Sequence, residues 1–288
     1  MHPAPSVIAF TVFSGFGFGL MVFLGLGWPA PRGTPAFLWW GLAYACAVGG
    51  LTASTLHLGN PERALMAFSQ WRSSWLSREA WAAVATLILC APTALSDWLG
   101  LGWPRLPGHL GALAALATLA STAMIYAQLK SVPRWNHWTT PALFGAFALT
   151  GGALAAGHAL PGALLAVLLA ALLAVSFRLG DAQFARAGQT IGSATGLDRI
   201  GTATVFEPPH TGSNYLLREM IHVVARKHAL KLRSLATAAQ VAAALTAAIP
   251  QALPLAVLLH LAGALVARWL FFAEAEHVVG LYYGQRVG

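Results

Sequence analysis

Long apolar runs, separated by short connections that hold most of the charge, constrain this chain more than any other feature. A bilayer core takes about 20 apolar residues in one helix. Eight runs approach this length, at residues 7–28, 36–57, 79–100, 109–129, 141–158, 161–179, 234–250 and 254–276. The pattern predicts an all-α polytopic membrane protein, a bundle of eight transmembrane helices with short interfacial helices between some of them.

Composition and charge support this class. Only 9% of the 288 residues are charged, whereas soluble domains carry about 25%. A net charge of +8 would suggest nucleic acid as the partner of a soluble chain. Here the basic residues stand in the connections, as they do in membrane proteins that contact anionic lipid. We therefore expect membrane lipid, and no nucleic acid, to face this charge.

The distribution of Lys and Arg predicts the orientation. With eight spans, the second, fourth and sixth connections share one face with both termini, and they hold nearly all the basic residues between the runs. The opposite connections hold only Arg32 and Arg105. Since cytoplasmic loops carry the basic excess, both termini are predicted to be cytoplasmic. The first run has no basic segment before it, so we interpret it as a retained span and not as a signal peptide.

We expect one integral membrane domain over residues 1–288. Its longest connection, residues 180–233, is predicted to be cytoplasmic. The first part is rich in Gly, Thr and Pro and reads as loop. From Asn214 the sequence SNYLLREMIHVVARKHALKLR places apolar residues near one side. This part predicts an amphipathic basic helix on the membrane surface.

The segment HLGNPERALMAFSQWRSSWLSREAW, residues 57–81, is unusually charged for its place between two apolar runs. Asn60 followed by Pro61 predicts the start of a short helix. This helix would lie in the membrane interface with Leu65, Met66 and Phe68 toward lipid. Ser77 is predicted to cap the third span. His57 then ends one span and Glu79 begins the next, at one depth on the cytoplasmic face.

His57 and Glu79 suggest proton transfer at the membrane. Ionisable groups at this depth usually face a cavity or one another, and both residue types transfer protons near neutral pH. A quinone needs an apolar slot with a few polar groups, so His57 is a candidate donor, Glu79 a candidate relay and Arg63 a candidate stabiliser of negative charge. The competing interpretation is that charges at span ends only snorkel to the interface, which we favour for Arg72 and Arg78.

More candidates follow on the same face. Tyr126 precedes the stretch KSVPRWNHWTTP, residues 130–141. With Lys130, Trp135 and His137 it forms a candidate second wall of a quinone pocket. Alternatively, the tryptophans of this stretch belong to the aromatic belt at the membrane surface. Glu274, Glu276 and His277 cluster at the end of the last run.

Metal cofactors are not expected in this chain. Cys46 and Cys90 lie inside apolar runs without ligand spacing, and an iron–sulfur cluster takes about four ligands. Haem is an alternative that needs two histidines facing each other at one depth. The histidines near spans are His57, His158, His260 and His277, and His158 lies near the opposite face from His57 and His277.

The motifs LHLGNPERA (56–64), SWLSREA (74–80) and VPRWNHWTTP (132–141) together resemble the DmsC family, the membrane-anchor subunits of dimethyl sulfoxide reductase-type complexes. The resemblance covers essentially the whole chain. It implies an anchor that holds a molybdopterin catalytic subunit and an iron–sulfur subunit, exchanges electrons between the nearest cluster and a quinone, and contains no haem. It also implies that His57, Gly59, Arg63 and Glu79 form the quinone site. Leu65 stands where the family often has an aromatic residue.

The predicted orientation narrows the resemblance. Family members that serve exported reductases place the motif face in the periplasm. In this chain the motif face is predicted to be cytoplasmic. With the stretches VPRWNHWTTP and FEPPHTGSNYLLREM, the chain resembles the family branch that serves cytoplasmic sulfite-oxidising complexes. The resemblance implies electron transfer to ubiquinone or menaquinone in the bacterial inner membrane during sulfite oxidation.

Three other functions stay open. One is the anchor of a dimethyl sulfoxide-type reductase that uses quinol, and another is a purely structural anchor that binds no quinone. The third is a transporter, which would have paired repeats or broken helices with polar residues at the midplane. The runs are nearly free of charge at their centres, which argues against a transporter.

Overall fold

The computed structural model describes residues 2–56, 60–204, 206–207 and 228–283, which form helices and contain no strand. The first helical segment runs without a break through α1 (Pro5–Ala9), the π-helical turn η1 (Phe10–Ser14) and α2 (Gly15–Leu26). The long helices that follow are α3 (Thr34–Thr55), α4 (Trp75–Leu99), α5 (Leu106–Ala127), α6 (Thr139–Ala155), α7 (Ala159–Arg186), α9 (Ala229–Ala247) and α10 (Leu253–Ala273). A long helix therefore occurs at each predicted position.

Six of the described segments are long and apolar enough to cross a membrane. They are Pro5–Leu26, α3, α4, α5, α7 and the segment Pro250–Tyr282 that contains α10. Helix α6 is apolar but has 17 residues, and α9 is not among the six. The all-helical, multi-pass architecture is confirmed, whereas the count of eight spans stays a prediction.

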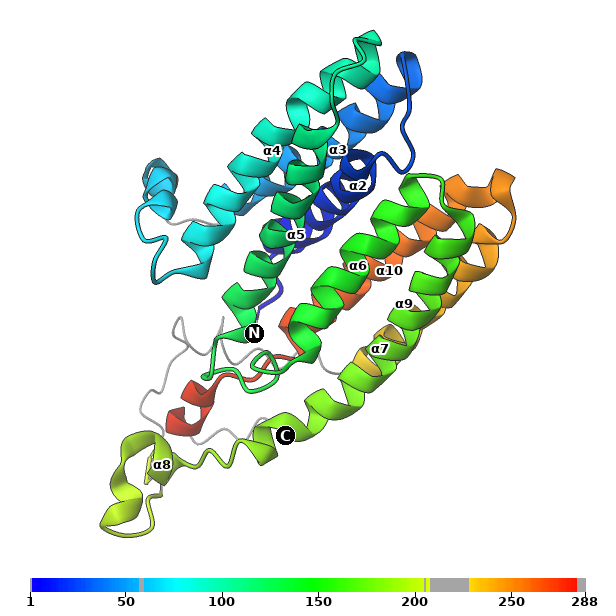
Figure 1. The fold of residues 1–288 in the computed structure, drawn as a ribbon. Coiled ribbons are helices and arrows are strands. Elements are labelled where there is room, and N and C mark those ends of the chain that lie inside the picture. Colours follow the sequence, from blue (N-terminus) through cyan, green and yellow to red (C-terminus); the bar gives the residue numbers. More distant parts are fainter. Residues whose placement is uncertain (1, 57–59, 205, 208–227, 284–288) are drawn as a thin grey trace.

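The helices form two groups that meet along α2. In Figure 1, α2 to α5 lie together in one half and α6, α7, α9 and α10 in the other. Contacts of α6 with α2 and α5, and of α10 with η1, join the halves. Glycine permits this close approach, because a Cβ on Gly19 would overlap the backbone of Ala148 and a Cβ on Gly152 would overlap the backbone of Gly19. Small residues play this role widely between membrane helices.

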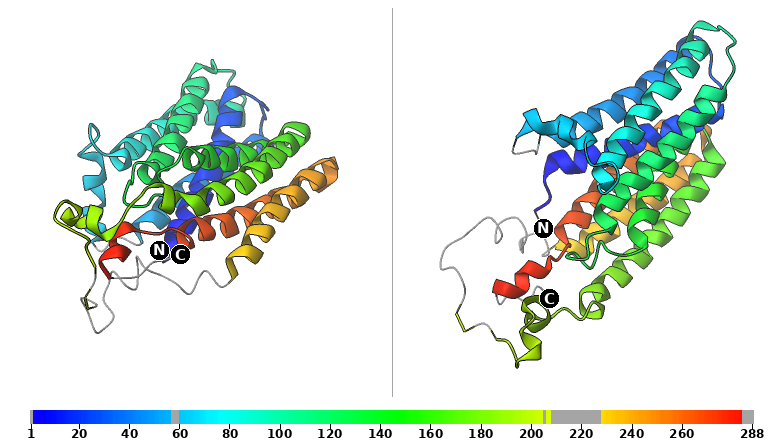
Figure 2. Two further views of the ribbon diagram at one scale, coloured as in Figure 1. Left: turned by 90° about the horizontal axis from the view of Figure 1, so that it is seen from below. Right: turned by 60° about the vertical axis from the view of Figure 1, so that its left-hand side comes forward.

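The two ends of the bundle differ in structure. The connections α2–α3, α4–α5, α6–α7 and α9–α10 gather at one end, called here the far end (Figure 1). The opposite end, called the motif end, holds η2 (Pro61–Phe68), the connection 128–138, α8 (Ile191–Thr195), η3 (Leu197–Arg199) and η7 (Val278–Tyr283). Figure 2 shows the same arrangement from two other sides.

An ion pair closes the far end of the first group. Arg105 Nη1 donates to Asp97 Oδ1 at 2.7 Å, and Arg105 Nη2 donates to the Leu24 carbonyl at 2.8 Å. Trp40 Nε1 donates to the other Asp97 oxygen at 3.1 Å. These bonds join α2, α3, α4 and the start of α5, so the buried Asp97 has a structural role.

Local details at the motif end differ from the sequence predictions. Pro61 does begin the short helix, which is the 3₁₀ helix η2, and Leu65 and Met66 are exposed on it. The prediction that Ser77 caps the third span is wrong. Helix α4 begins at Trp75 with Ser74 at the N-cap position, because the returning chain packs Ser77 inside, where its hydroxyl accepts from the backbone N–H of Gln70 at 3.2 Å.

The long connection is described only in part. The amphipathic helix predicted from Asn214 falls mainly on residues 208–227, which lie outside the described residues. Helix α9 begins at Ala229, before the predicted start at residue 234. Its first turn therefore extends the seventh helix toward the motif end.

Candidate functional site

Glu79 lies in the second turn of α4 and points into the bundle. Only 3% of the residue is exposed. Thr122 Oγ1 on α5 donates to Glu79 Oε1 at 2.5 Å. Among the described residues no Lys or Arg forms an ion pair with this carboxyl. A snorkelling side chain would reach the interface, so this burial favours a functional interpretation.

Tyr126 and Trp135 form an aromatic wall, whose Tyr126 end lies near Glu79. Both are buried, and their ring centroids are 5.3 Å apart in an edge-to-face contact. Trp135 stacks on Phe271 with centroids 5.1 Å apart and donates from Nε1 to the Phe271 carbonyl at 2.8 Å. Trp135 is therefore a packed residue and not part of an aromatic belt. The Tyr126 hydroxyl lies within electrostatic range of both Glu79 and Arg268.

The other predicted residues lie further from this centre or outside the described chain. Arg63 and Lys130 are exposed. His137 is half-buried, with Nδ1 2.9 Å from the Thr139 hydroxyl. In the described part of the chain no hydrogen bond or ion pair joins these three residues to Glu79. His57 and Gly59 lie outside the described residues, so their place in the site stays a prediction.

The electrostatic state of His137 follows from its surroundings. Partial burial and the positive charge of Arg186 lower the pKa of His137 below its usual value. Since an unperturbed histidine titrates near pH 6.5, this imidazole is predominantly neutral at pH 7. It is therefore a hydrogen-bonding group and not a fixed cation.

The arginines before Glu79 are held by the backbone. Arg78 Nε donates to the Trp71 carbonyl at 3.0 Å, and its Nη2 donates to the Arg72 carbonyl at 2.6 Å. The Arg78 guanidinium also lies 4.3 Å from the centre of the Trp75 ring. These contacts favour the structural interpretation of Arg78. Beside it, Trp71, Arg78 and Trp81 line a groove of about 390 Å³.

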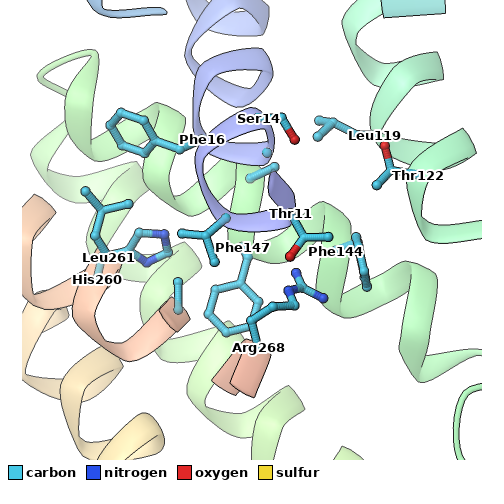
Figure 3. A pocket seen from close by; sticks show the side chains of 14 residues that line it. Thr11, Ser14, Phe16, Leu119, Thr122, Phe144, Phe147, His260, Leu261 and Arg268 are labelled. Carbon is cyan, nitrogen blue, oxygen red and sulfur yellow. The ribbon is translucent and has the colours of Figure 1, made fainter. Parts of the chain in front are cut away.

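A much smaller cavity lies on the inner side of Thr122. Its volume is about 20 Å³, enough for about one water molecule and too small for a quinone ring. Figure 3 shows its polar lining, with Thr11 and Ser14 from η1, Thr122 from α5, and His260 and Arg268 from α10. The sequence interpretation missed both Thr122 and Arg268. The available signal was that Arg268 is a charged residue inside an apolar run, which by itself suggests function.

His260 is held inside the second group of helices. It is 2% exposed, and its Nδ1 lies 2.8 Å from Oε1 of the buried Gln240. This bond engages one of the two ring nitrogens. In the part of the chain that the structure describes, no group of three or more His, Cys, Asp or Glu side chains is arranged to hold a metal ion.

A four-residue ion-pair cluster closes the motif end of the second group. Arg134 pairs with Glu274 at 2.6 Å and with Asp181 at 3.0 Å. Arg233 pairs with the same two acids, at 2.6 Å to Glu274 and 2.5 Å to Asp181. The cluster connects the segment before α6 with α7, α9 and the end of α10. The role of Glu274, noted in the sequence as part of an acidic cluster, is therefore structural.

Comparison with known proteins gives two matches over nearly the whole chain. Residues 1–283 match the family model described as "DMSO reductase anchor subunit (DmsC)". The chain is 31% identical to the C subunit of the sulfite dehydrogenase of Allochromatium vinosum over an alignment of 328 positions, which covers 98% of this chain and 99% of that protein. No solved structure matches the chain. The resemblance inferred from the three motifs is confirmed.

Proposed function

Because the chain belongs to the DmsC family of molybdoenzyme membrane anchors, we propose that it is the quinone-reactive anchor of a sulfite-oxidising complex. In this complex a molybdopterin subunit oxidises sulfite, and an iron–sulfur subunit delivers the electrons to the site on this chain. The similarity to a sulfite dehydrogenase protein supports sulfite as the substrate of the catalytic partner. Electrons then flow from the partner's nearest cluster to quinone.

The observation that carries this proposal is the buried carboxyl of Glu79. A membrane-embedded acid on the wall of a helix bundle is costly unless it serves an internal reaction. Thr122 holds one carboxyl oxygen at 2.5 Å, so the orientation of the group is fixed while the other oxygen is left for a second partner. This arrangement suits a residue that gives and receives protons.

The residues present fit a quinone on the outer side of α4. The groove lined by Trp71, Arg78 and Trp81, about 390 Å³, lies in the size range of ligand pockets and has aromatic walls. The inner cavity, at about 20 Å³, does not fit the ring. We place the ring at the motif end of α4, near Glu79 and the predicted contacts His57 and Gly59, with the groove as the entry from the lipid side.

Quinone, when bound, takes up two electrons and two protons. Glu79 holds one of these protons at its free carboxyl oxygen, and His57 is the proposed second donor. Arg63 is exposed at the same end of the bundle, and its positive charge favours negative charge on the reduced quinone. Tyr126 contributes the buried wall beside Glu79.

The remaining predicted contact residues have supporting roles in this proposal. Trp135 fixes the wall through its ring contact with Tyr126. Lys130 and His137 follow on the same connection at the motif end, where a proton entering from water meets them first. The neutral state of His137 allows it to accept such a proton.

The proposed topology has the motif end in the cytoplasm and eight spans. Helix α6 has 17 residues, about 25 Å at 1.5 Å per residue, which is close to the roughly 30 Å of a bilayer core. The excess of basic residues at the motif end supports a cytoplasmic location. The iron–sulfur and molybdopterin partners then bind in the cytoplasm of a bacterial cell, at its inner membrane.

Substitution of Glu79 tests the proposal. Sulfite turnover of the purified complex is measured with a quinone and, separately, with an artificial dye that takes electrons directly from the partner subunits. In Glu79→Gln we expect quinone-linked turnover to fall about a hundredfold or more while dye-linked turnover is unchanged. The matched control is Glu62→Gln, since Glu62 is an exposed acid on η2, and it should retain both activities.

The same preparation tests the partners. Iron and molybdenum should co-purify with the chain in mild detergent. Quinone-linked turnover of Glu79→Gln equal to that of the parent complex would remove Glu79 from the reaction. Absence of both metals would leave the proposed anchor without its electron source.

A further inference from the structure

Arg268 is a buried cation in the last turns of α10. Only 5% of the residue is exposed. Its guanidinium lies 3.6 Å from the centre of the Phe144 ring and within 6 Å of the rings of Phe147 and Phe271. In the described chain it forms no ion pair or hydrogen bond. Ring faces attract a cation only weakly compared with a carboxylate, so the charge calls for an acidic partner.

The acid nearest in the sequence is already occupied. Glu274 lines a second small cavity together with Arg268. However, one of its oxygens binds Arg134 and the other binds Arg233, each at 2.6 Å. Glu274 is therefore neutralised by two other arginines. It is not the partner that explains a charge at position 268.

The other acid is reached across the inner cavity. Arg268 and Thr122 line the same cavity from different helices, α10 and α5 (Figure 3), and Thr122 donates directly to Glu79. Tyr126, one turn after Thr122 on α5, lies within electrostatic range of both Glu79 and Arg268. Arg268 therefore lines the cavity itself, whereas Glu79 is connected to it through the Thr122 hydroxyl.

The wall of this cavity carries an independent sign of function. Residues Phe10–Ser14 form a π-helical turn within an otherwise continuous helix, a distortion often found at functional sites. Thr11 and Ser14 of this turn line the cavity. Their hydroxyls donate to carbonyls of the same helix, Thr11 to Val7 at 3.0 Å and Ser14 to Phe10 at 2.6 Å, so each hydroxyl oxygen can still accept a hydrogen bond.

We propose that Arg268 is the counter-charge of Glu79, acting through the cavity and past Tyr126 without contacting the quinone. The inference rests on the proposed function. When Glu79 gives its proton to the quinone, which is reduced by the partner's cluster, a carboxylate is left in the membrane. Arg268 stabilises that carboxylate until a proton from the cytoplasmic water restores the acid.

The elements that surround this pair differ in the titratable groups that they carry. Helices α1, α2 and α6 and the turn η1 contain none. Helix α3 brings Tyr44, whose hydroxyl donates to the Leu87 carbonyl, and Cys46. The remaining groups on elements packed against α4 or α10 are Glu62 and Arg63 on η2, Arg78, Cys90 and Asp97 on α4, His109 and Tyr126 on α5, Lys231 and Arg233 on α9, and His260, with Arg134 and Glu274 in the ion-pair cluster. Arg268 is thus the buried cation that shares a cavity with the hydroxyl bonded to Glu79.

Infrared spectroscopy of the quinone-free complex tests the proposal without using activity. The carboxylic-acid band of Glu79 is identified by its loss in Glu79→Gln, and its strength is followed against pH. In general, at an effective dielectric constant of about 20, a unit charge about 10 Å from a titrating group changes the protonation equilibrium of that group roughly tenfold. In Arg268→Met we therefore expect the band to persist to a pH about one unit higher.

Two further variants separate charge from packing. Arg268→Lys keeps the charge and should show the parent titration. Arg268→Gln is a second neutral variant, for use if Arg268→Met accumulates poorly, and it should show the same shift as Arg268→Met. The matched control is Arg105→Met, which removes a partly buried arginine at the far end and should leave the band unchanged. An unchanged Glu79 titration in both neutral variants would overturn the proposal.

Kinetics give the second readout. The rate of quinone reduction in a single turnover should fall about tenfold in Arg268→Met, with unchanged quinone affinity, and it should recover in Arg268→Lys. If Glu79→Gln abolishes quinone turnover and Arg268→Met matches the parent protein, only this inference fails. If Glu79→Gln itself matches the parent protein, the proposed function fails, while the infrared result still decides whether the two charges are coupled.

Discussion

Thr122→Val removes the hydrogen bond to Glu79 while conserving the shape of the side chain. The Thr122 hydroxyl is buried and lies 2.5 Å from Glu79 Oε1. A hydrogen bond to a charged group contributes about 1.5–3 kcal/mol, and about 1.4 kcal/mol corresponds to a factor of ten in rate. If Glu79 transfers the proton as a carboxyl held by Thr122, quinone-linked turnover should fall roughly tenfold to a hundredfold. Dye-linked turnover should not change.

A matched control lies one turn earlier on the same helix. Thr118 is also fully buried, and its hydroxyl donates to the Ala114 carbonyl at 2.9 Å and lies 3.2 Å from the Thr86 hydroxyl. Thr118→Val should therefore have a similar effect on stability and leave quinone turnover close to normal. Thr122→Ser, which keeps the hydroxyl, should retain most of the activity. Parent-like turnover in Thr122→Val, or an equal loss in Thr118→Val, would refute the reasoning.

Three more predictions concern the rest of the fold. Glu274→Gln should destabilise the protein by about 3 kcal/mol, because it leaves two partly buried arginines without a buried carboxylate. Loss of the half-exposed Asp181 carboxylate in Asp181→Asn should cost about 1 kcal/mol or less. Thermal unfolding in detergent compares the two variants, and equal losses of stability would contradict this ranking. Gly152→Val should prevent close packing of α6 on α2 and reduce the amount of assembled complex, measured by co-purification; a normal yield would contradict that packing. Because the pKa of His137 is lowered in the folded state, stability should fall as the pH drops below about 6.5, where the unfolded state binds the proton first. His137→Gln should flatten that loss in unfolding measured between pH 5 and pH 7, and an identical pH dependence would argue against a neutral, partly buried imidazole.

The sequence predicted the positions of the helices well, because hydrophobic length is a local property. The run at 109–129 corresponds to α5, and the run at 254–276 to α10. Local patterns were weaker at helix ends. The prediction that Ser77 caps a helix was wrong because the chain before α4 folds back and buries this serine, which no local rule registers.

The candidate site was predictable only in part. Glu79 was identified because a single acid at the start of a span is rare and expensive. Thr122 was missed, since a threonine in an apolar run is an ordinary residue until α4 and α5 are placed side by side. Arg268 was missed although it stands inside an apolar run, because only the packing of α10 against η1 and α6 places it inside the bundle.

Labelling with a photoactivatable quinone tests the central claim most directly. The native complex is illuminated with the probe, digested, and analysed by mass spectrometry, with excess unlabelled quinone as competitor. We expect competitor-sensitive attachment at the motif end, on the first turns of α4 or on the segment from His57 to Trp81. Attachment confined to the far end around Asp97 and Arg105, or no labelling that the competitor removes, would contradict a quinone site at Glu79.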